Sequence, residues 1–177
     1  YKGSNLTITN YAGKGTIYLQ EGATLTIENG VTIPNIVIQT TTDKTDYATI
    51  STNGNLTISS ATYNNADIQT SGTIKLPDTT EDNKIGNLLI ESGELTIETL
   101  YAANLTNDGT LSTKTVTVTD NITNAENATI TATNGSVTVG TNLTNSGSMN
   151  VATTNVGGNL NDNGTWLADG EINFVGK

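Results

Sequence analysis

The segment NLTNSGSM, residues 142–149, decides the fold, because closely related phrases occur twice more in the chain. NLTNDGTL occupies residues 104–111, and NLNDNGTW occupies residues 159–166. The equivalent apolar positions of successive repeats are Leu105, Ile122, Leu143 and Leu160. Such a set, with a period of about 20 residues, indicates a solenoid, in which each repeat forms one coil and stacks on the next.

A second set of apolar positions recurs at a constant spacing, at Leu95, Val116 and Val137. Each is followed by a Thr and then by another apolar residue. Alternation with period two places both apolar side chains on one face of a strand and the Thr on the other. The side chains that we predict to be buried are Leu95, Ile97, Val116, Val118, Val137, Val139, Leu143 and Leu160.

The composition agrees with short strands joined by tight turns. Of the 177 residues, 36 are Thr, which favours strands, and 24 are Asn, which favours turns. Repeats of about 17–21 residues are too short for propeller blades, and no stretch keeps helical spacing. We therefore predict an all-β right-handed parallel β-helix, with stacked strands about 4.8 Å apart. Residues 1–177 should form a single β-helix segment.

The repeated phrase is predicted to form one corner of each coil. Asn and Gly accept left-handed backbone conformations that other residues resist. Stacked Asn side chains can also form hydrogen bonds from coil to coil. The last residue of each phrase (Leu111, Met149 or Trp166) should face inward.

The charge excludes several classes of partner. The net charge is −10, with seven Lys and no Arg, so nucleic acid and anionic lipid surfaces should be repelled. The chain has no Cys, and it has no apolar run long enough to span a bilayer. We expect neither a nucleic-acid partner nor membrane insertion by this segment.

The phrases and their spacing resemble the repeats of filamentous-haemagglutinin-like exoproteins, which are bacterial surface adhesins of the type V secretion routes. The resemblance is clearest over residues 94–177 and looser over residues 1–93. The Asn-Pro-Asn motifs typical of that family's secretion domain are absent. The resemblance implies a right-handed coil, an extracellular location at the bacterial cell surface, and a place in the shaft of an adhesin that contributes to virulence.

An enzymatic function is not expected. The chain lacks His, Arg and Cys, which removes the commonest general base and the thiolate nucleophile. Paired carboxylates remain the only catalytic candidates. They are Asp78, Glu81 and Asp82 in one loop, and Glu91, Glu94 and Glu98 at strand ends. We interpret both groups as solvated, and we expect no cofactor; Ca²⁺ at residues 78–82 is a minor alternative.

Other surface features have simple interpretations. Eight Asn residues lie in Asn-x-Ser/Thr sequons and are candidate glycan acceptors: Asn5, Asn55, Asn104, Asn121, Asn127, Asn134, Asn142 and Asn163. Outward Thr rows also suggest ice binding, but uneven coil lengths argue against it. Tyr18, Tyr47 and Tyr63 are aromatic residues that could stack on sugars, but they do not cluster in the sequence, so we interpret them as exposed surface residues.

Two irregular stretches, residues 40–48 and 76–84, interrupt the strand rhythm with charged residues. We predict that both leave the coil as protruding loops, and that deleting residues 79–84 changes thermal stability little. The residues expected to contact a receptor in these loops are Asp43, Tyr47, Asp78, Glu81 and Asp82.

The chain starts and stops within its repeat pattern, so we expect a fragment of a longer repetitive protein or pairing with other copies at uncapped ends. The expected function is a structural and adhesive shaft segment that contacts a host-cell receptor or glycan. Two alternatives are a self-assembling extracellular filament subunit and a glycan-binding or glycan-active β-helix.

Overall fold

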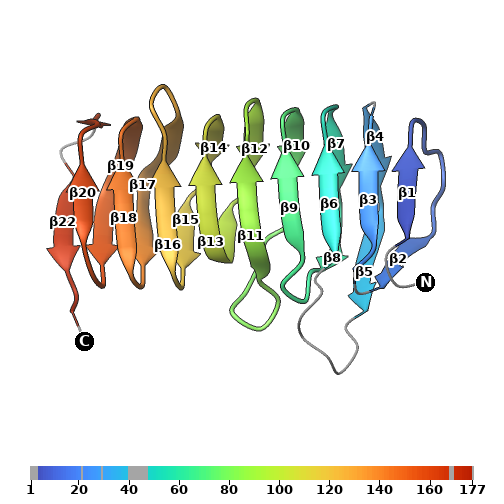
Figure 1. The fold of residues 1–177 in the computed structure, drawn as a ribbon, viewed down its shortest axis with the longest axis horizontal. Helices are drawn as coiled ribbons and strands as arrows, with labels where there is room; N and C mark the ends of the chain where they lie inside the picture. Colours follow the sequence, from blue (N-terminus) through green and yellow to red (C-terminus); the bar gives the residue numbers. More distant parts are fainter. Residues whose placement is uncertain (1–3, 21, 29, 40–47, 168–169, 177) are drawn as a thin grey trace.

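The computed structural model describes residues 4–20, 22–28, 30–39, 48–167 and 170–176. These residues form strands and turns without a helix, as predicted. The strands coil into a β-solenoid of about eight turns, stacked side by side from the N-terminal to the C-terminal end of a rod (Figure 1). Every pairing between its named strands is parallel, so the β-helix is confirmed.

The strands of the coils form three faces of the rod. The first face stacks β1 (Asn5–Ile8), β3 (Thr24–Ile27), β6 (Thr49–Thr52), β9 (Asp67–Thr70), β11 (Ile85–Ile90), the second half of β13 (Thr99–Asn107), β16 (Asn121–Asn124), β18 (Asn142–Asn145) and β20 (Leu160–Asp162). This stack runs unbroken along the rod.

The second face stacks β4 (Val31–Ile33), β7 (Leu56–Ile58), β10 (Thr73–Lys75), β12 (Glu94–Thr96), β14 (Thr110–Ser112), the first halves of β17 (Thr129–Val139) and β19 (Ser148–Val156), and β21 (Thr165–Trp166). The third face holds β2 (Thr16–Gln20), β5 (Asn35–Gln39), β8 (Ala61–Thr62), the first half of β13, β15 (Thr115–Val118), the second halves of β17 and β19, and β22 (Glu171–Phe174). Among the described strands, the pairing is interrupted on this face, between β8 and β13.

The core is a set of apolar columns that run along the rod axis. Leu105, Ile122 and Leu143 are fully buried and stack in register with Leu160, as the repeat spacing predicts. Of the eight side chains predicted to be buried, seven are buried. Leu160 is the exception and is half-buried, because it lies in the last coil, where a neighbour covers it from one side.

The equivalence of Leu95 and Val116 that the spacing suggests is wrong. Leu95 pairs with Leu111 on the second face, whereas Val116 pairs with Leu100 on the third. One full coil takes the chain from Leu95 to Leu111, the residue that stacks on it. Val116 lies further along the chain than Leu111, so it has already passed the corner and belongs to the third face. All three faces carry the same apolar alternation, and the sequence alone does not distinguish them.

The repeated phrase spans a strand, a corner and the start of a second strand. In residues 142–149, Asn142–Asn145 is β18, and β19 begins at Ser148. The corner glycine Gly147 does not have a positive φ, so the predicted left-handed conformation is wrong here. A Cβ on Gly147 would lie 2.3 Å from the carbonyl oxygen of Ala125. Glycine is required because the backbone of the preceding coil lies too close for a side chain.

The last residue of the phrase faces inward, as predicted. Leu111 and Met149 are fully buried and stack through Ile130 in one column. Trp166 continues this column in the last coil, where it is half-buried against the core. Its size is accommodated because the last coil is covered from one side.

One buried hydroxyl lacks a partner and gives a simple stability prediction. Thr154 is fully buried between Val137 and Ile172 in an apolar column, and its Oγ1 forms no hydrogen bond. An unsatisfied buried hydroxyl costs about 1–3 kcal/mol. Thr154→Val should therefore raise the free energy of unfolding by about 1 kcal/mol, measured by denaturant titration. Thr154→Ser, which keeps the hydroxyl and removes a methyl group, should lower it. Equal loss of stability in both variants would contradict the prediction.

Candidate interaction surfaces

An exposed column of asparagines follows the first face of the rod. Each side-chain amide donates to the carbonyl oxygen of the Asn one coil earlier, over 3.0–3.3 Å: Asn159 to Asn142, Asn142 to Asn121, Asn121 to Asn104, and Asn104 to Asn87. Asn87 then donates to Asp67 Oδ1 at 2.9 Å. The predicted coil-to-coil bonding of Asn side chains is confirmed. Three sequon asparagines, Asn104, Asn121 and Asn142, therefore hold their amide nitrogens in this column.

A second asparagine column lies inside the rod, and the sequence-based predictions did not include it. Asn107 donates to Asn124 at 2.8 Å, Asn124 to Asn145 at 2.9 Å, and Asn145 to Asp162 at 2.9 Å. The three Asn side chains are fully buried. The sequence NLTN could have predicted this column, because its second Asn lies two positions after an inward Leu and therefore also points inward.

The two columns run in opposite directions, and each ends on a carboxylate. The exposed column donates toward the N-terminal end and finishes at Asp67, whereas the buried column donates toward the C-terminal end and finishes at Asp162. A chain of amides polarised in one direction presents a donor at its end, and a carboxylate is a strong acceptor. Each aspartate thus completes its column.

Asp162 also links the buried column to the single Trp of the chain. Its Oδ2 accepts a 2.7 Å hydrogen bond from Trp166 Nε1, and its Oδ1 accepts one from the backbone N–H of Gly164. Burial alone would raise the pKa of Asp162, but the hydrogen bonds from Trp166, Asn145 and Gly164 lower the pKa below its ordinary value of 3.8.

This link predicts acid-induced loosening of the last coil. Because the pKa of Asp162 is lowered by folding, its stabilising effect is complete above pH 3.8 and is lost as the pH falls through the lowered value. Trp166 fluorescence should shift to the red over that acidic range, before the circular dichroism of the whole rod changes. Asp162→Asn should remove this separate transition. An identical fluorescence profile in the variant would show that Asp162 is not its cause.

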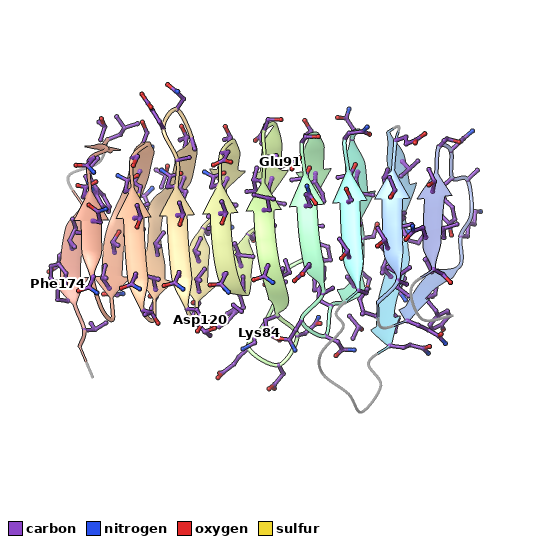
Figure 2. The ribbon with its side chains drawn as sticks, viewed as in Figure 1. Lys84, Glu91, Asp120 and Phe174 are labelled. Carbon is purple, nitrogen blue, oxygen red and sulfur yellow. The ribbon has the colours of Figure 1, made fainter. Side chains whose placement is uncertain are left out.

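The stretch of residues 76–84 was predicted to protrude, and only its tip does so (Figures 1 and 2). Thr80, Glu81 and Asp82 are exposed, whereas Thr79 is fully buried. The loop lies where strand pairing on the third face is interrupted, between β8 and β13. Its side chains take over the hydrogen bonds that a strand would make there.

On the side of the loop that faces β13, Asp78 and Thr79 form the hydrogen bonds. Asp78 Oδ1 accepts from the backbone N–H of Thr99 at 2.8 Å, and Thr79 Oγ1 accepts from that of Tyr101 at 2.5 Å. The backbone N–H of Thr79 donates to the carbonyl oxygen of Thr99. Asp78, predicted as a receptor contact, therefore has a structural role.

On the side of the loop that faces β8, Asn83 forms the hydrogen bonds. Its Nδ2 donates to the carbonyl oxygen of Ala61 at 3.0 Å, and its Oδ1 accepts from the backbone N–H of Tyr63 at 2.6 Å. Tyr63 is fully buried and its hydroxyl donates to the carbonyl oxygen of Pro77. Burial, and to a smaller extent the Asp78 carboxylate, raise the pKa of Tyr63. The prediction that Tyr63 is an exposed surface residue was wrong, and its burial also rules out stacking on sugars.

The remaining predicted residues are spread over the rod. Asp43 and Tyr47 lie outside the described residues. The other sequon asparagines, Asn5, Asn55, Asn127, Asn134 and Asn163, are exposed. The carboxylates of Glu91, Glu94 and Glu98 accept hydrogen bonds from three different residues, namely Gln69, Ser112 and Lys114.

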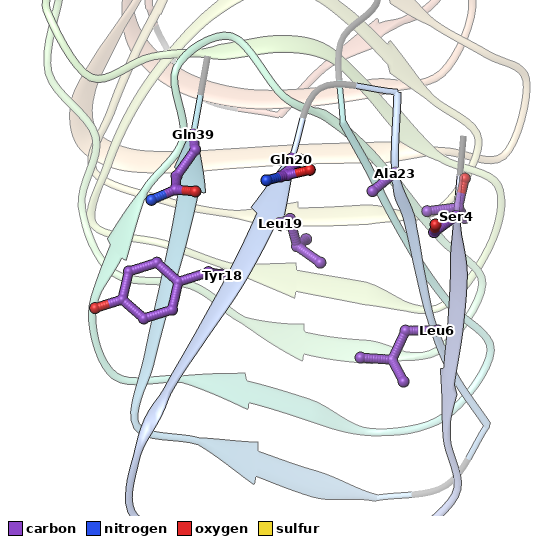
Figure 3. Close-up of a pocket in the computed structure, with 8 residues that line it drawn as sticks. Ser4, Leu6, Tyr18, Leu19, Gln20, Ala23 and Gln39 are labelled. Carbon is purple, nitrogen blue, oxygen red and sulfur yellow. The ribbon is translucent and has the colours of Figure 1, made fainter. Parts of the chain in front are cut away.

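The first coil contains a hollow beside its exposed Tyr18 (Figure 3). The hollow has a volume of about 380 Å³ and lies between β1 and β2. Leu6, Leu19 and Ala23 form its apolar part, and Gln20 and Gln39 lie at its rim. It is the open end of the apolar core of the first coil.

Within the described residues, no group of three or more His, Cys, Asp or Glu side chains is arranged to hold a metal ion. The same part of the chain contains no helix long and apolar enough to cross a membrane. Comparison with protein-family models, with curated proteins and with solved structures finds no match. The class of the protein is given by its fold alone, which is a parallel β-solenoid.

Proposed function

We propose that this chain is a shaft segment of a secreted bacterial cell-surface adhesin. The observation that supports the proposal is the unbroken first face, in which each strand from β1 to β20 pairs with the next. Backbone hydrogen bonds along the rod axis, reinforced by the two asparagine columns, join one coil to the next. Such a rod resists bending, and it holds a contact surface at a distance from its point of attachment.

The adhesive contact is assigned to the tip of the loop at residues 80–82. Glu81 and Asp82 are exposed at this tip, and Asp78, Thr79 and Asn83 hold its base on the coil. An acidic tip on a rigid base favours a cationic patch on a host-cell receptor, or a glycan held through hydrogen bonds. The proposed location is extracellular, and the proposed mechanism needs no catalysis or cofactor.

Binding to host cells tests this proposal. Beads coated with the chain should adhere to cultured epithelial cells or to members of a glycan array, and the double variant Glu81→Ala/Asp82→Ala should lose most of that binding. The matched control is Glu126→Ala, which removes an exposed carboxylate elsewhere on the rod. Absence of binding to every cell type and glycan, or equal loss in the control, would contradict the adhesive assignment.

A further inference from the structure

The outward side chains of the first face form two straight columns over the coils from β11 to β20. Each strand pairs in register with the next, and the strands stand side by side and point the same way (Figure 1). None of these side chains is charged, in a chain of net charge −10. We call this surface the polar face. Its first column is Asn87, Asn104, Asn121, Asn142 and Asn159, and its second is Leu89, Thr106, Thr123, Thr144 and Asn161.

Coil length varies along the rod, but the variation does not reach the polar face. Successive Asn of the first column are 17, 17, 21 and 17 residues apart. The longer coil has its extra residues within 125–128 and within 133–135, outside the strands of the first face. Each of these segments contains an Asn with a positive φ, Asn127 or Asn134. The uneven coil lengths that argued against ice binding are therefore taken up away from this face.

Hydrogen bonds and side-chain shape hold the polar face in a fixed arrangement. Each amide of the Asn column donates one of its two hydrogens to the coil before it, so the other hydrogen is free to bind water. The β-branched Thr side chains are stiff at χ1. Within the described part of the chain, the hydroxyls of Thr106, Thr123 and Thr144 form no hydrogen bond to protein atoms. The face thus presents N–H and O–H groups at the strand spacing of about 4.8 Å.

The charges around the polar face indicate which ligand it fits. Glu91 and Asp108 directly follow β11 and β13, and Asp120 directly precedes β16; all three are exposed. Figure 2 shows Glu91 and Asp120 at opposite borders of the first face. These borders repel an anionic ligand, and they repel a second copy of the chain, which carries the same carboxylates. No aromatic side chain lies in the two columns to stack on a sugar ring.

The ligand that matches such a face is uncharged and carries hydrogen-bonding groups at a regular spacing. Ice is such a ligand, because the oxygen atoms at its surface both donate and accept hydrogen bonds. Along one direction of the lattice these oxygen atoms repeat at a distance close to the spacing of stacked strands.

We propose that the polar face binds ice. The Thr hydroxyls and the free Asn hydrogens hold water molecules at the strand spacing, and these waters join the outer layer of the crystal. A bound chain stops the growth of the ice beneath it, and the ice front between bound chains becomes curved, which lowers its freezing temperature. This function goes beyond the proposed adhesive function and uses a different surface from the tip of the loop at residues 80–82.

The growth of a single ice crystal tests the proposal. In a solution of the chain, a crystal held just below its melting point should stop growing over a measurable temperature interval and should develop facets. The double variant Thr123→Lys/Thr144→Lys places two long, charged side chains in the middle of the polar face. It should lose most of this interval, because the face can no longer lie flat against the lattice.

The matched control is Thr117→Lys/Thr138→Lys, which places the same two side chains at paired outward positions of the third face. It should keep the interval, and circular dichroism verifies that both double variants keep their strands. An unmodified chain that leaves crystal growth unaltered at millimolar concentration would overturn the proposal. Equal loss of the interval in both double variants would do the same.

A second arm separates ice from other ordered surfaces and from adhesion. Binding of the chain to microcrystalline cellulose, without any effect on ice, would assign the polar face to a sugar lattice and overturn the proposal. Glu81→Ala/Asp82→Ala, the variant that tests the adhesive function, should keep the full interval. Failure of ice binding is therefore distinguishable from failure of adhesion.

Discussion

Val118→Asp is expected to cost several kcal/mol of folding stability, among the largest losses from a single substitution in this chain. Val118 is fully buried on the third face and stacks between Ala102 and Val139. A carboxylate there would have apolar neighbours on both sides, and burying an unpaired charge is far more costly than losing the methyl groups. Chemical denaturation followed by circular dichroism measures the loss.

The control for this substitution is Thr117→Asp, one residue earlier on the same strand. Thr117 points outward and is half-buried, so its carboxylate can reach water. Its effect should stay below about 1 kcal/mol. Comparable losses at both positions would mean that the assignment of inward and outward positions in β15 is wrong.

Deleting residues 79–84 is expected to lower the free energy of unfolding by about 3 kcal/mol or more, the opposite of what the sequence predicted. The deletion removes the hydrogen bonds from Thr79 to β13 and from Asn83 to the Ala61–Tyr63 backbone. It also leaves backbone groups of the interrupted third face without partners and uncovers Tyr63, and each buried orphan costs about 1–3 kcal/mol. The melting temperature should fall by roughly 6–12 °C at about 2–4 °C per kcal/mol.

The tip of the same loop provides the matched control. Replacing Glu81 and Asp82 by Ala removes two exposed charges and leaves Asp78, Thr79 and Asn83 in place. Stability should change by less than about 0.5 kcal/mol for each substitution. If the deletion proved as mild as the tip variant, the bonds that bridge the third face would contribute nothing measurable.

Several features of this protein follow from local sequence rules. Alternating apolar residues in Val116–Val118 and Val137–Val139 indicate strands with one buried face, and the repeated phrase indicates that those strands stack in register. The inward positions of Leu111 and Met149 follow from the same alternation. The buried asparagine column was predictable too, because the parity that buries Leu143 also buries Asn145.

Other features depend on contacts between residues of different coils. The face to which Leu95 belongs is set by the length of its coil, and that length is fixed by where each corner packs on the coil before it. Asp78, Thr79 and Asn83 look like an ordinary polar loop in the sequence. Their role depends on the strand edges of β8 and β13, which come to lie on either side of the loop only after the coils have formed.

The sequence by itself thus determined the all-β class, the solenoid period and the direction of most side chains, because these depend on a two-residue alternation and a short repeat. The tertiary structure decided which coil positions are neighbours and which polar side chains replace missing backbone partners. It also decided that both asparagine columns end on carboxylates, at Asp67 and Asp162. These properties arise from contacts between residues of successive coils, and local alternation carries no information about which of those contacts form.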